Sequence, residues 1–390
     1  MIKKIILFLL FVICLPAIAL AAAGFLFFAS PASAQTFRFV AWGDTKSDTG
    51  VLQSLSNQIK SLNPKFTIYA GDLESSGFTQ AGMNIWKNAI NGGSNNGLFN
   101  ITFPARGNHD SADPAGWQNY FNLSAAAQAI GAANYNFNSG EDDLTYSFDY
   151  GNSRIIGIDV PGNVSKMTAA QISWLDNRLT DAEQKGLTHA FFFWHGPFDS
   201  QANHCCPVPP PALISVFNKH PVISAGFFGH EHMLTYSHIN SSRVSGVTRE
   251  FEQFISGDAG AGPTTPTAGK YDYSLNLAGG NTGGFVTVDV NGNSYTVNFY
   301  KGGTASSQKS FTFTKGSPPI TGQATPTVTI PPGGKPGDAN NDNIVDGQDY
   351  MVWRANYNTQ ASGGASIGDF DSNARVDGQD YMIWRGNYLK

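Results

Sequence analysis

Short hydrophobic runs alternate with longer polar or amphipathic stretches from Gln35 to about Lys315. The clearest runs are "FRFVAW", "KFTIYAG", "ITFPARG", "HAFFFWHG" and "PVISAGFFG". Apolar runs of this length are typical of buried strands, and their alternation with amphipathic stretches is typical of strands joined by helical crossovers. The pattern therefore predicts an α/β domain over this span.

One helix and several hairpins stand out within the span. Residues 168–185 place Ile172, Leu175, Leu179 and Ala182 on one face at helical spacing. The segments "LTYSFDYGNSRIIGIDV", "GGFVTVDVNGNSYTVNFY" and "SFTFTK" instead alternate with period two around Gly and Asn turns, which predicts antiparallel hairpins. We expect a sheet with α/β crossovers and added β-hairpins.

Composition supports a folded chain and disfavours one class of partner. The 390 residues are 41% hydrophobic and 14% charged, which is enough for a packed core. Binding to a nucleic-acid backbone needs clustered Lys and Arg, and a chain with a formal net charge of -5 has no such footprint. We therefore predict no nucleic-acid partner.

The N-terminus has the order of a signal peptide. A pair of lysines precedes an uncharged apolar run, Ile5 to Phe28, and the small residues "ASA" follow. We predict a signal peptide over residues 1–34, cleavage before Gln35, and a secreted or cell-surface-associated protein. The run is long enough to span a bilayer, so an uncleaved membrane anchor is the alternative.

Cysteine usage gives no disulfide framework. Cleavage would remove Cys14 and leave only the adjacent pair Cys205-Cys206. We expect a vicinal disulfide or two loop thiols there, because two neighbouring cysteines alone are poor evidence for a metal site.

A repeat follows a change of composition near the C-terminus. Pro, Thr and Gly dominate residues 316–336, which predicts an extended linker. In residues 337–390, "GDANNDNIVDGQDYMVWRANY" recurs as "GDFDSNARVDGQDYMIWRGNY" 31 residues later. Each copy has the oxygen ligands of an EF-hand-like calcium loop at positions 1, 3, 5, 7, 9 and 12. The predicted ligands are Asp338, Asn340, Asp342, the carbonyl of Ile344, Asp346 and Asp349, and Asp369, Asp371, Asn373, the carbonyl of Arg375, Asp377 and Asp380.

This repeat resembles the dockerin family, in which paired calcium loops, each followed by one helix, form a small domain that docks onto a cohesin partner. Position 6 departs from the usual Gly, being Asn343 or Ala374, and position 12 is Asp where Glu is usual. The resemblance implies a small all-α calcium domain and a cohesin-type partner. Repeated Tyr-Met-Val/Ile-Trp-Arg helices favour docking, because exposed aromatics and Arg are typical of binding hot spots. A calcium-stapled cap without a partner is the alternative.

Five further stretches carry candidate chemistry at or just beyond the end of an apolar run. They are "GD" with Asp44, "GDLES" with Asp72, "GNHD" with Asn108 and His109, "WHGP" with His195, and "GHEH" with His230 and His232. Each alone is a common turn, cap or loop residue. Ligands at strand ends in an α/β fold converge on one edge of the sheet, however, so together they predict one site.

The five motifs resemble those of the calcineurin-like metallophosphoesterase superfamily, including its purple-acid-phosphatase-like members, over most of residues 36–315. The resemblance implies a two-sheet sandwich flanked by helices (αββα) in a domain over residues 35–315, with two metal ions at the strand ends. The implied ligands are Asp72 as a bridge, Asn108, His195 and His230 for one metal, and Asp44 and His232 for the other. Such mixed ligands suit Zn, Mn or Fe.

The implied reaction is hydrolysis of a phosphomonoester or phosphodiester. Two cations lower the pKa of a bridging water and neutralise phosphate oxygens, so that hydroxide attacks phosphorus near neutral pH. Asp72 and His109 are the predicted catalytic residues. His109 corresponds to the family residue that assists the leaving group or holds a phosphate oxygen. A general acid typically increases the reaction rate by about 10²- to 10⁴-fold.

Lys46 and Ser75 depart from the family pattern. Relatives supply a further ligand as a His two residues after the first aspartate, or as a Tyr three residues after the second. The metal of Asp44 and His232 therefore lacks one protein ligand, and three interpretations are open. A water or a nearby oxygen such as Glu74 or Asp48 fills the empty ligand position, or this metal is weakly held, or the Lys46 ammonium replaces part of the metal's charge. Lys46 and the loop residue His204 are also candidates for contact with substrate.

The leading prediction is a secreted, metal-dependent phosphoesterase positioned by its dockerin-like domain. One alternative is a non-catalytic protein that keeps a degraded metal site and acts through calcium-dependent docking. A nucleotidase, or an enzyme of this fold acting on a non-phosphate ester, is another. No extra nucleotide-recognition domain is visible before the linker, which disfavours the nucleotidase.

Overall fold

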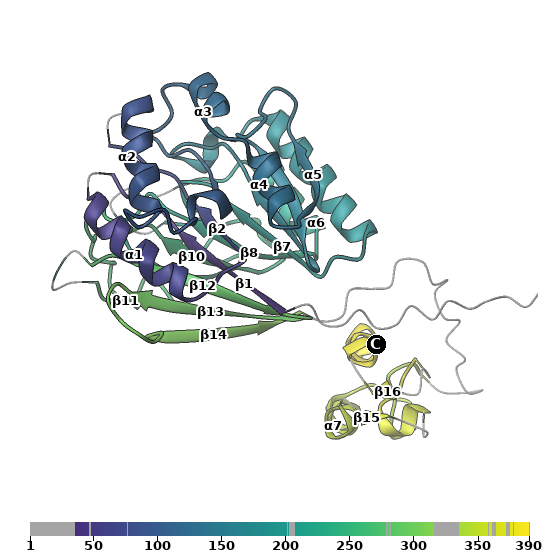
Figure 1. Cartoon of the computed structure of the whole chain (residues 1–390). Helices are drawn as coiled ribbons and strands as arrows, with labels where there is room; N and C mark the ends of the chain where they lie inside the picture. Colours follow the sequence, from purple (N-terminus) through teal and green to yellow (C-terminus); the bar gives the residue numbers. More distant parts are fainter. Residues whose placement is uncertain are drawn as a thin grey trace, which may run out of the picture. The chain divides into compact units, whose positions relative to one another are not determined.

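The computed structural model describes residues 36–46, 48–75, 77–200, 202, 207–277, 280, 282–315, 335–357, 359–360, 364–371, 375–376 and 378–389 (Figure 1). Several predicted features lie outside these residues. They are the signal peptide with its cleavage site, residues 316–334 of the linker, His204, the Cys205-Cys206 pair, and the calcium candidates Asn373 and Asp377. Within the described ranges, no helix is long and apolar enough to cross a membrane.

Residues 36–315 contain two β-sheets. The six-stranded sheet contains, in spatial order, β14 (Lys309–Thr314), β13 (Ser294–Lys301), β12 (Gly284–Asn291), β1 (Thr36–Trp42), β2 (Phe66–Tyr69) and β3 (Thr102–Pro104). The eight-stranded sheet contains β11 (Tyr273–Leu275), β9 (Leu234–Ile239), β10 (Phe251–Ser256), β8 (Ile223–Phe228), β7 (His189–Phe193), β6 (Ser153–Gly157), β5 (Tyr146–Tyr150) and β4 (Ala133–Phe137). β1, β2 and β3 run parallel, as do β6, β7, β8 and β10, so their carboxyl ends lie at one edge of each sheet.

Helices cover both sheets (Figure 1). They are α1 (Thr49–Ser61), α2 (Gln80–Ile90), α3 (Pro114–Tyr120), α4 (Leu123–Ala129), α5 (Ala169–Gln184) and α6 (Pro211–Lys219), with short 3₁₀ turns at Phe99–Ile101 and Val164–Lys166. One buried hydrophobic cluster joins both sheets to α1 and α2, and includes the edge-on ring pair Phe39 and Phe227, whose centroids are 5.6 Å apart. A second cluster joins the eight-stranded sheet to α5 and α6. The predicted α/β two-sheet fold is confirmed.

The predicted helix and hairpins are confirmed. In α5, the hydroxyl of Thr168 accepts a hydrogen bond from the Gln171 backbone N–H at 3.2 Å, and the Gln171 side chain accepts one from the Thr168 N–H at 2.9 Å, which forms a capping box. The four residues predicted for its inner face are all buried. β5 with β6, and β12 with β13, pair antiparallel around tight turns, and β14 adds to the edge of the second hairpin.

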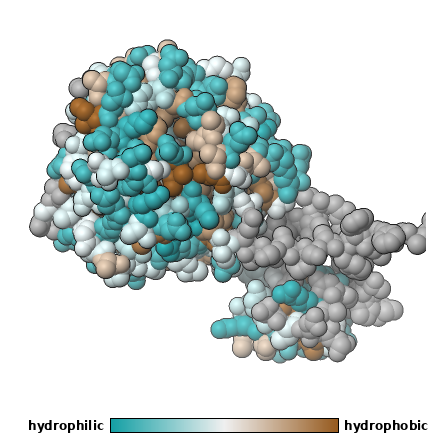
Figure 2. Space-filling model, viewed as in Figure 1, coloured by the Kyte–Doolittle hydropathy of each residue, from teal (hydrophilic) through white to brown (hydrophobic). Residues whose placement is uncertain are grey.

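The face of residues 36–315 in Figure 2 is mostly hydrophilic or neutral, with hydrophobic residues in small groups. Scattered exposed apolar residues are normal on folded proteins and mark no binding surface by themselves.

The described parts of residues 335–389 contain two helices and two short strands. The helices are α7 (Gly347–Asn356) and α8 (Gly378–Asn387), with a 3₁₀ turn at Gly364–Ile367. The expectation of an all-α module is corrected in one detail, because β15 (Thr359–Gln360) and β16 (Arg375–Val376) form a two-residue antiparallel pair. One contact recurs in the described residues before the two helices: Asp349 accepts from the Ala339 N–H at 2.7 Å, and Asp380 accepts from the Phe370 N–H at 2.6 Å.

Four aromatic residues of the repeat pack between α7 and α8, whereas Tyr357 and Tyr388 are exposed. The rings of Tyr350 and Trp384 lie 5.0 Å apart between α7 and α8, and those of Trp353 and Tyr381 lie 5.1 Å apart. All four are half-buried, because a module this small uses its largest side chains to join its two helices. Large hydrophobic residues that remain exposed are Ile344, Met351, Tyr357, Tyr388 and Leu389.

Candidate metal centre

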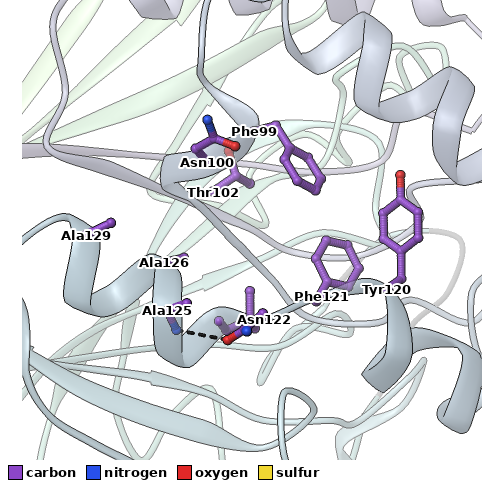
Figure 3. Close-up of a pocket in the computed structure, with 10 residues that line it drawn as sticks. Phe99, Asn100, Thr102, Tyr120, Phe121, Asn122, Ala125, Ala126 and Ala129 are labelled. Atoms are coloured by element: carbon purple, nitrogen blue, oxygen red, sulfur yellow. Dashed lines mark hydrogen bonds between the residues drawn. The ribbon is translucent and has the colours of Figure 1, made fainter.

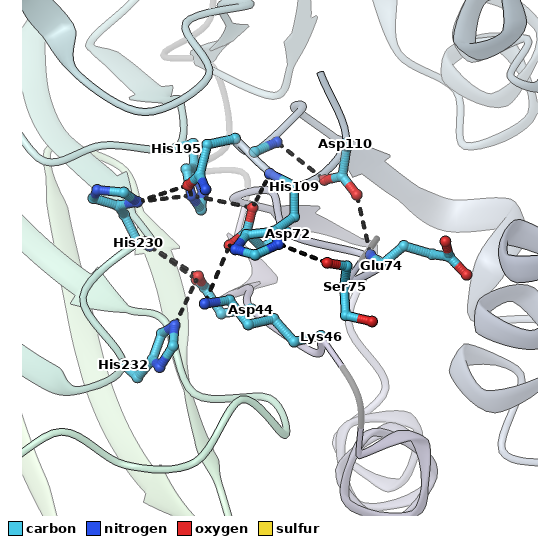
Figure 4. Close-up of polar contacts among 12 residues, drawn as sticks. Asp44, Lys46, Asp72, Glu74, Ser75, His109, Asp110, His195, His230 and His232 are labelled. Atoms are coloured by element: carbon cyan, nitrogen blue, oxygen red, sulfur yellow. Dashed lines mark hydrogen bonds and ion pairs between the residues drawn. The ribbon is translucent and has the colours of Figure 1, made fainter. Parts of the chain in front are cut away.

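The residues of the five motifs meet at the carboxyl ends of parallel strands. Asp44 and Lys46 follow β1, Asp72 follows β2, and Asn108 and His109 follow β3 in the six-stranded sheet. His195 follows β7, and His230 and His232 follow β8 in the other sheet. Figure 4 shows the labelled side chains of both groups directed toward one another. The site therefore lies where the two sheets bring their loops together.

His195 is held in one tautomer. Its ring is fully buried, and Nδ1 lies 2.7 Å from the carbonyl oxygen of Ala70, which can only accept a hydrogen bond, so Nδ1 carries the proton. Burial lowers the pKa of His195 and favours the neutral ring. Nε2 therefore presents a lone pair to the other residues of the site, as a metal-binding imidazole requires.

Three potential ligand atoms converge on that lone pair. Asn108 Oδ1 lies 3.0 Å from His195 Nε2 and 3.0 Å from His230 Nδ1, and the two nitrogens are 3.1 Å apart. Asp72 Oδ1 lies 3.3 Å from His195 Nε2. The four side chains predicted for one metal are thus brought together.

Asp44 and His232 form the neighbouring part of the site. The Asp44 carboxylate is completely buried and accepts the backbone N–H of His230 at 3.0 Å. His232 Nε2 lies 3.8 Å from Asp44 Oδ1. Burial, followed by the charge of Asp72, raises the pKa of Asp44 well above its usual range. Two buried carboxylates placed this close require a positive charge to remain ionised.

The backbone at the site adopts left-handed conformations in residues other than glycine. The φ angles are +61° at Asp44, +49° at Lys46, +52° at Asp72 and +69° at His230. Such conformations cost about 1 kcal/mol or more each and collect at functional sites. The glycine of "GNHD" is also required, because a Cβ on Gly107 would collide with the Asp72 carboxylate.

His109 faces the site with one nitrogen. Its Nδ1 lies 2.8 Å from the carbonyl oxygen of Ser75 and so carries a proton, and its backbone N–H donates to Asp72 Oδ1 at 3.0 Å. Nε2 lies 3.9 Å from Asp72 Oδ2. Ser75 therefore holds His109 through its carbonyl group.

The side-chain oxygens of Glu74 and Asp48 do not fill the open ligand position at the metal predicted for Asp44 and His232. The Asp48 carboxylate caps α1 and accepts the backbone N–H groups of Gly50 and Val51 at 3.1 Å each. The Glu74 side chain lies against the start of α2, where a Cβ on Gly82 would collide with it, and Figure 4 shows it directed away from the site. Lys46, in contrast, is directed inward, with Nζ 3.8 Å from Asp72 Oδ2.

Comparison with known proteins assigns the family. The family model described as "Calcineurin-like phosphoesterase" matches residues 37–234, which is half of the chain. The chain belongs to this family. No curated protein matches the chain.

Two solved structures illustrate the likeness. The purple acid phosphatase PPD1 from yellow lupin (Lupinus luteus) seeds has 15% sequence identity and a TM-score of 0.53, with 73% of this chain and 55% of the lupin chain covered. A dimetal phosphatase from Danio rerio has 14% identity and a TM-score of 0.47, with 72% and 99% covered. The chain therefore spans little more than half of the lupin enzyme, and at this identity the lupin structure supports the fold alone.

The side chains present fit the dinuclear metal site that the calcineurin-like phosphoesterase family implies. Ligand atoms of Asp44, Asp72 and His232 lie within 4.8 Å of one another, so these residues could hold a metal ion. Asp72 Oδ2 is buried, and no group in the described ranges donates a hydrogen bond to it. A buried carboxylate oxygen without a donor is costly unless a cation binds it.

Two positioning residues were missed by the sequence analysis. Asp110 is buried behind Asp72 and accepts the backbone N–H groups of Leu73, Glu74 and Gly107, each at 3.0 Å, so that it ties the second motif to the third. Burial raises its pKa to about 7. Arg106 donates to Asp159 at 2.8 Å and to the Ser111 carbonyl at 3.1 Å, which fixes the far side of the third motif. The Asp of "GNHD" and the Arg before it were the available signals.

Histidines outside the motifs are engaged elsewhere. His189 contacts Ser224 and the carbonyl of Gly292, His220 lies between Asp176 and Glu183, and His238 contacts Glu250 and Glu252. These contacts give the three histidines structural or surface roles away from the motif residues.

A cavity of about 400 Å³ lies apart from the motif residues, between the turn at Phe99 and α4 (Figure 3). Phe99, Tyr120 and Phe121 line its apolar side. Its Asn122 side chain caps α4 by accepting the Ala125 N–H at 3.0 Å. That polar group already serves the fold, so the cavity gives no sign of chemistry.

Proposed function

We propose that this chain is a metal-dependent phosphoesterase that hydrolyses phosphomonoesters or phosphodiesters. The observation that carries the proposal is the convergence of Asp72 with Asn108, His195 and His230 on one side and with Asp44 and His232 on the other. These are oxygen and nitrogen ligands suited to Zn, Mn or Fe. When bound, the metal ions supply an activated water and neutralise phosphoryl oxygens.

The chain's own residues then hold the substrate and manage a proton. Asp72 would contribute to both metal positions, and the hydrogen bond from His195 to Ala70 would keep the imidazole lone pair available to one of them. His109 Nε2 faces the site, and in our proposal it either protonates the leaving oxygen or holds a phosphoryl oxygen. Lys46 adds a positive charge that attracts the phosphoryl group.

Turnover of nitrophenyl monoester and diester substrates by the full chain tests the proposal. The variant Asp72→Asn should reduce kcat/KM by at least ~10²-fold, because it weakens both metal positions. The exposed Asp142→Asn serves as the matched control and should be unchanged. Absence of turnover in the wild type with Zn, Mn and Fe would favour the alternative of a non-catalytic protein, which the inward Lys46 supports.

We propose that residues 337–390 bind calcium and dock onto a cohesin-type protein. Ligand atoms of Asp369, Asp371 and Asp380 lie within 4.8 Å of one another, which supports one of the two loops. Calcium titration followed by Trp fluorescence tests this, since Trp353 and Trp384 lie between the helices that the loops precede. Binding to a panel of cohesin domains with and without chelator tests docking; no binding to any of them would favour a calcium-stapled cap.

We also propose that the protein is exported and cleaved before Gln35. Sequencing the N-terminus of the exported protein checks this. A protein that starts at Gln35 supports cleavage, whereas a membrane-bound form that keeps residues 1–34 would favour the anchor.

A further inference from the structure

The Lys46 backbone is hydrogen-bonded beside the site, and its side chain is directed inward. Its N–H donates to the Asp72 carbonyl oxygen at 3.2 Å, and its φ of +49° is unusual for a long side chain. The side chain is 22% exposed and its Nζ lies 3.8 Å from Asp72 Oδ2. Figure 4 shows it extending toward Asp44 and Asp72, the two buried carboxylates of the site.

An ammonium group and a metal dication compete at such a position. A protonated lysine has no lone pair to offer a metal, so it cannot replace the missing ligand. It is attracted by the same carboxylates as the metal, and it repels a dication that binds them.

The two metal positions are therefore unequal. Around His195 Nε2, Asn108 Oδ1 lies at 3.0 Å, His230 Nδ1 at 3.1 Å and Asp72 Oδ1 at 3.3 Å. The other position has three protein groups and not four, namely Asp44, Asp72 and His232, and Lys46 lies beside it with Nζ 3.8 Å from Asp72 Oδ2.

We propose that Lys46 is an internal competitor for the metal of Asp44, Asp72 and His232, so that this position loads last and more weakly than its neighbour. The inference rests on the proposed function, because it assumes that the cluster binds metal. It predicts an enzyme that keeps one tightly bound ion and exchanges the other.

Zinc binding to the full chain, measured by calorimetry in excess calcium, tests the inference. Calcium keeps the oxygen-only loops of residues 337–390 filled. The wild type should bind one zinc tightly and a second at least ~10-fold more weakly. Asp44→Asn should remove the second event, which assigns it to this position.

Two substitutions separate charge from ligation. Lys46→His removes the ammonium and adds an imidazole, and should tighten the second zinc at least ~10-fold. Lys46→Gln removes the charge alone and should tighten it by a smaller factor. Lys60→His makes the same change on the exposed face of α1 and should alter neither event. His is tolerated at positive φ and Gln keeps the length of Lys, so at least one variant should fold.

The inference would be overturned if the wild type bound two zinc ions with equal affinity. It would also be overturned if both Lys46 variants bound the second zinc with the same affinity as the wild type. Failure of the proposed function gives a different result: neither the wild type nor any variant would bind zinc at the cluster.

Discussion

The residue with the most specific expected effect is His109, whose Nε2 faces Asp72 while Nδ1 is fixed on Ser75. If it protonates the leaving oxygen, His109→Ala should lower kcat by about 10²- to 10⁴-fold for an alkyl phosphate and far less for a nitrophenyl ester, whose leaving group needs no acid. Steady-state kinetics on both substrates measure the difference. Equal losses would assign His109 to phosphoryl binding, and no loss with either would contradict both roles. His238→Ala, away from the motifs, is the control.

His189 should make stability depend on pH. Burial lowers its pKa to about 4, so as pH falls the unfolded chain takes up this proton first, near pH 6.5. The contribution of the neutral His189 ring to the stability of the folded chain is therefore complete above about pH 6.5 and is lost progressively toward pH 4. Between pH 7 and 5 the wild type should lose about 2 kcal/mol more unfolding free energy than His189→Gln, as measured by urea titration. Parallel curves for the two proteins would contradict this assignment.

At the scale of single residues, the sequence identified the side chains that meet at the site but not the groups that position them. Asp44, Asp72 and the motif histidines were identifiable because each follows an apolar run. The inward direction of Lys46 and the buried role of Asp110 depend on loop conformation and on backbone N–H groups more than thirty residues away, which no local pattern encodes.

Among the elements, α5 begins with a capping box. Thr168→Ala removes the hydroxyl that accepts the Gln171 N–H and should lower the unfolding free energy by about 1 kcal/mol. Ser173→Ala, at an exposed position of the same helix, should have little effect. Denaturant unfolding compares the two, and equal stability of both variants would mean that the cap contributes nothing.

The order of strands could not be predicted from local patterns. Strands such as β1 and β7 follow from their apolar runs, and the β12–β13 hairpin follows from its turn. The pairing of β1 with β12 joins segments far apart in the chain, and β11 pairs with β9 and not with β10, the strand before it in sequence. Such pairings depend on which faces must be buried together, a property of the whole domain.

For the molecule as a whole, we predict two independent metal dependences. A chelator selective for calcium should unfold residues 337–390, because paired loops that lose their ions keep little core. Phosphoester hydrolysis should continue, since the motif residues belong to the two-sheet domain. Circular dichroism and turnover on the same sample test this, and simultaneous loss of both signals would contradict the modular account.

The central claim is that the converging motif side chains form a metal centre. Anomalous diffraction from zinc-soaked crystals of the full chain tests it most directly. We predict a strong peak among Asp72, Asn108, His195 and His230, with a weaker one beside Asp44 and His232. An ordered site with zinc in neither position would contradict the account.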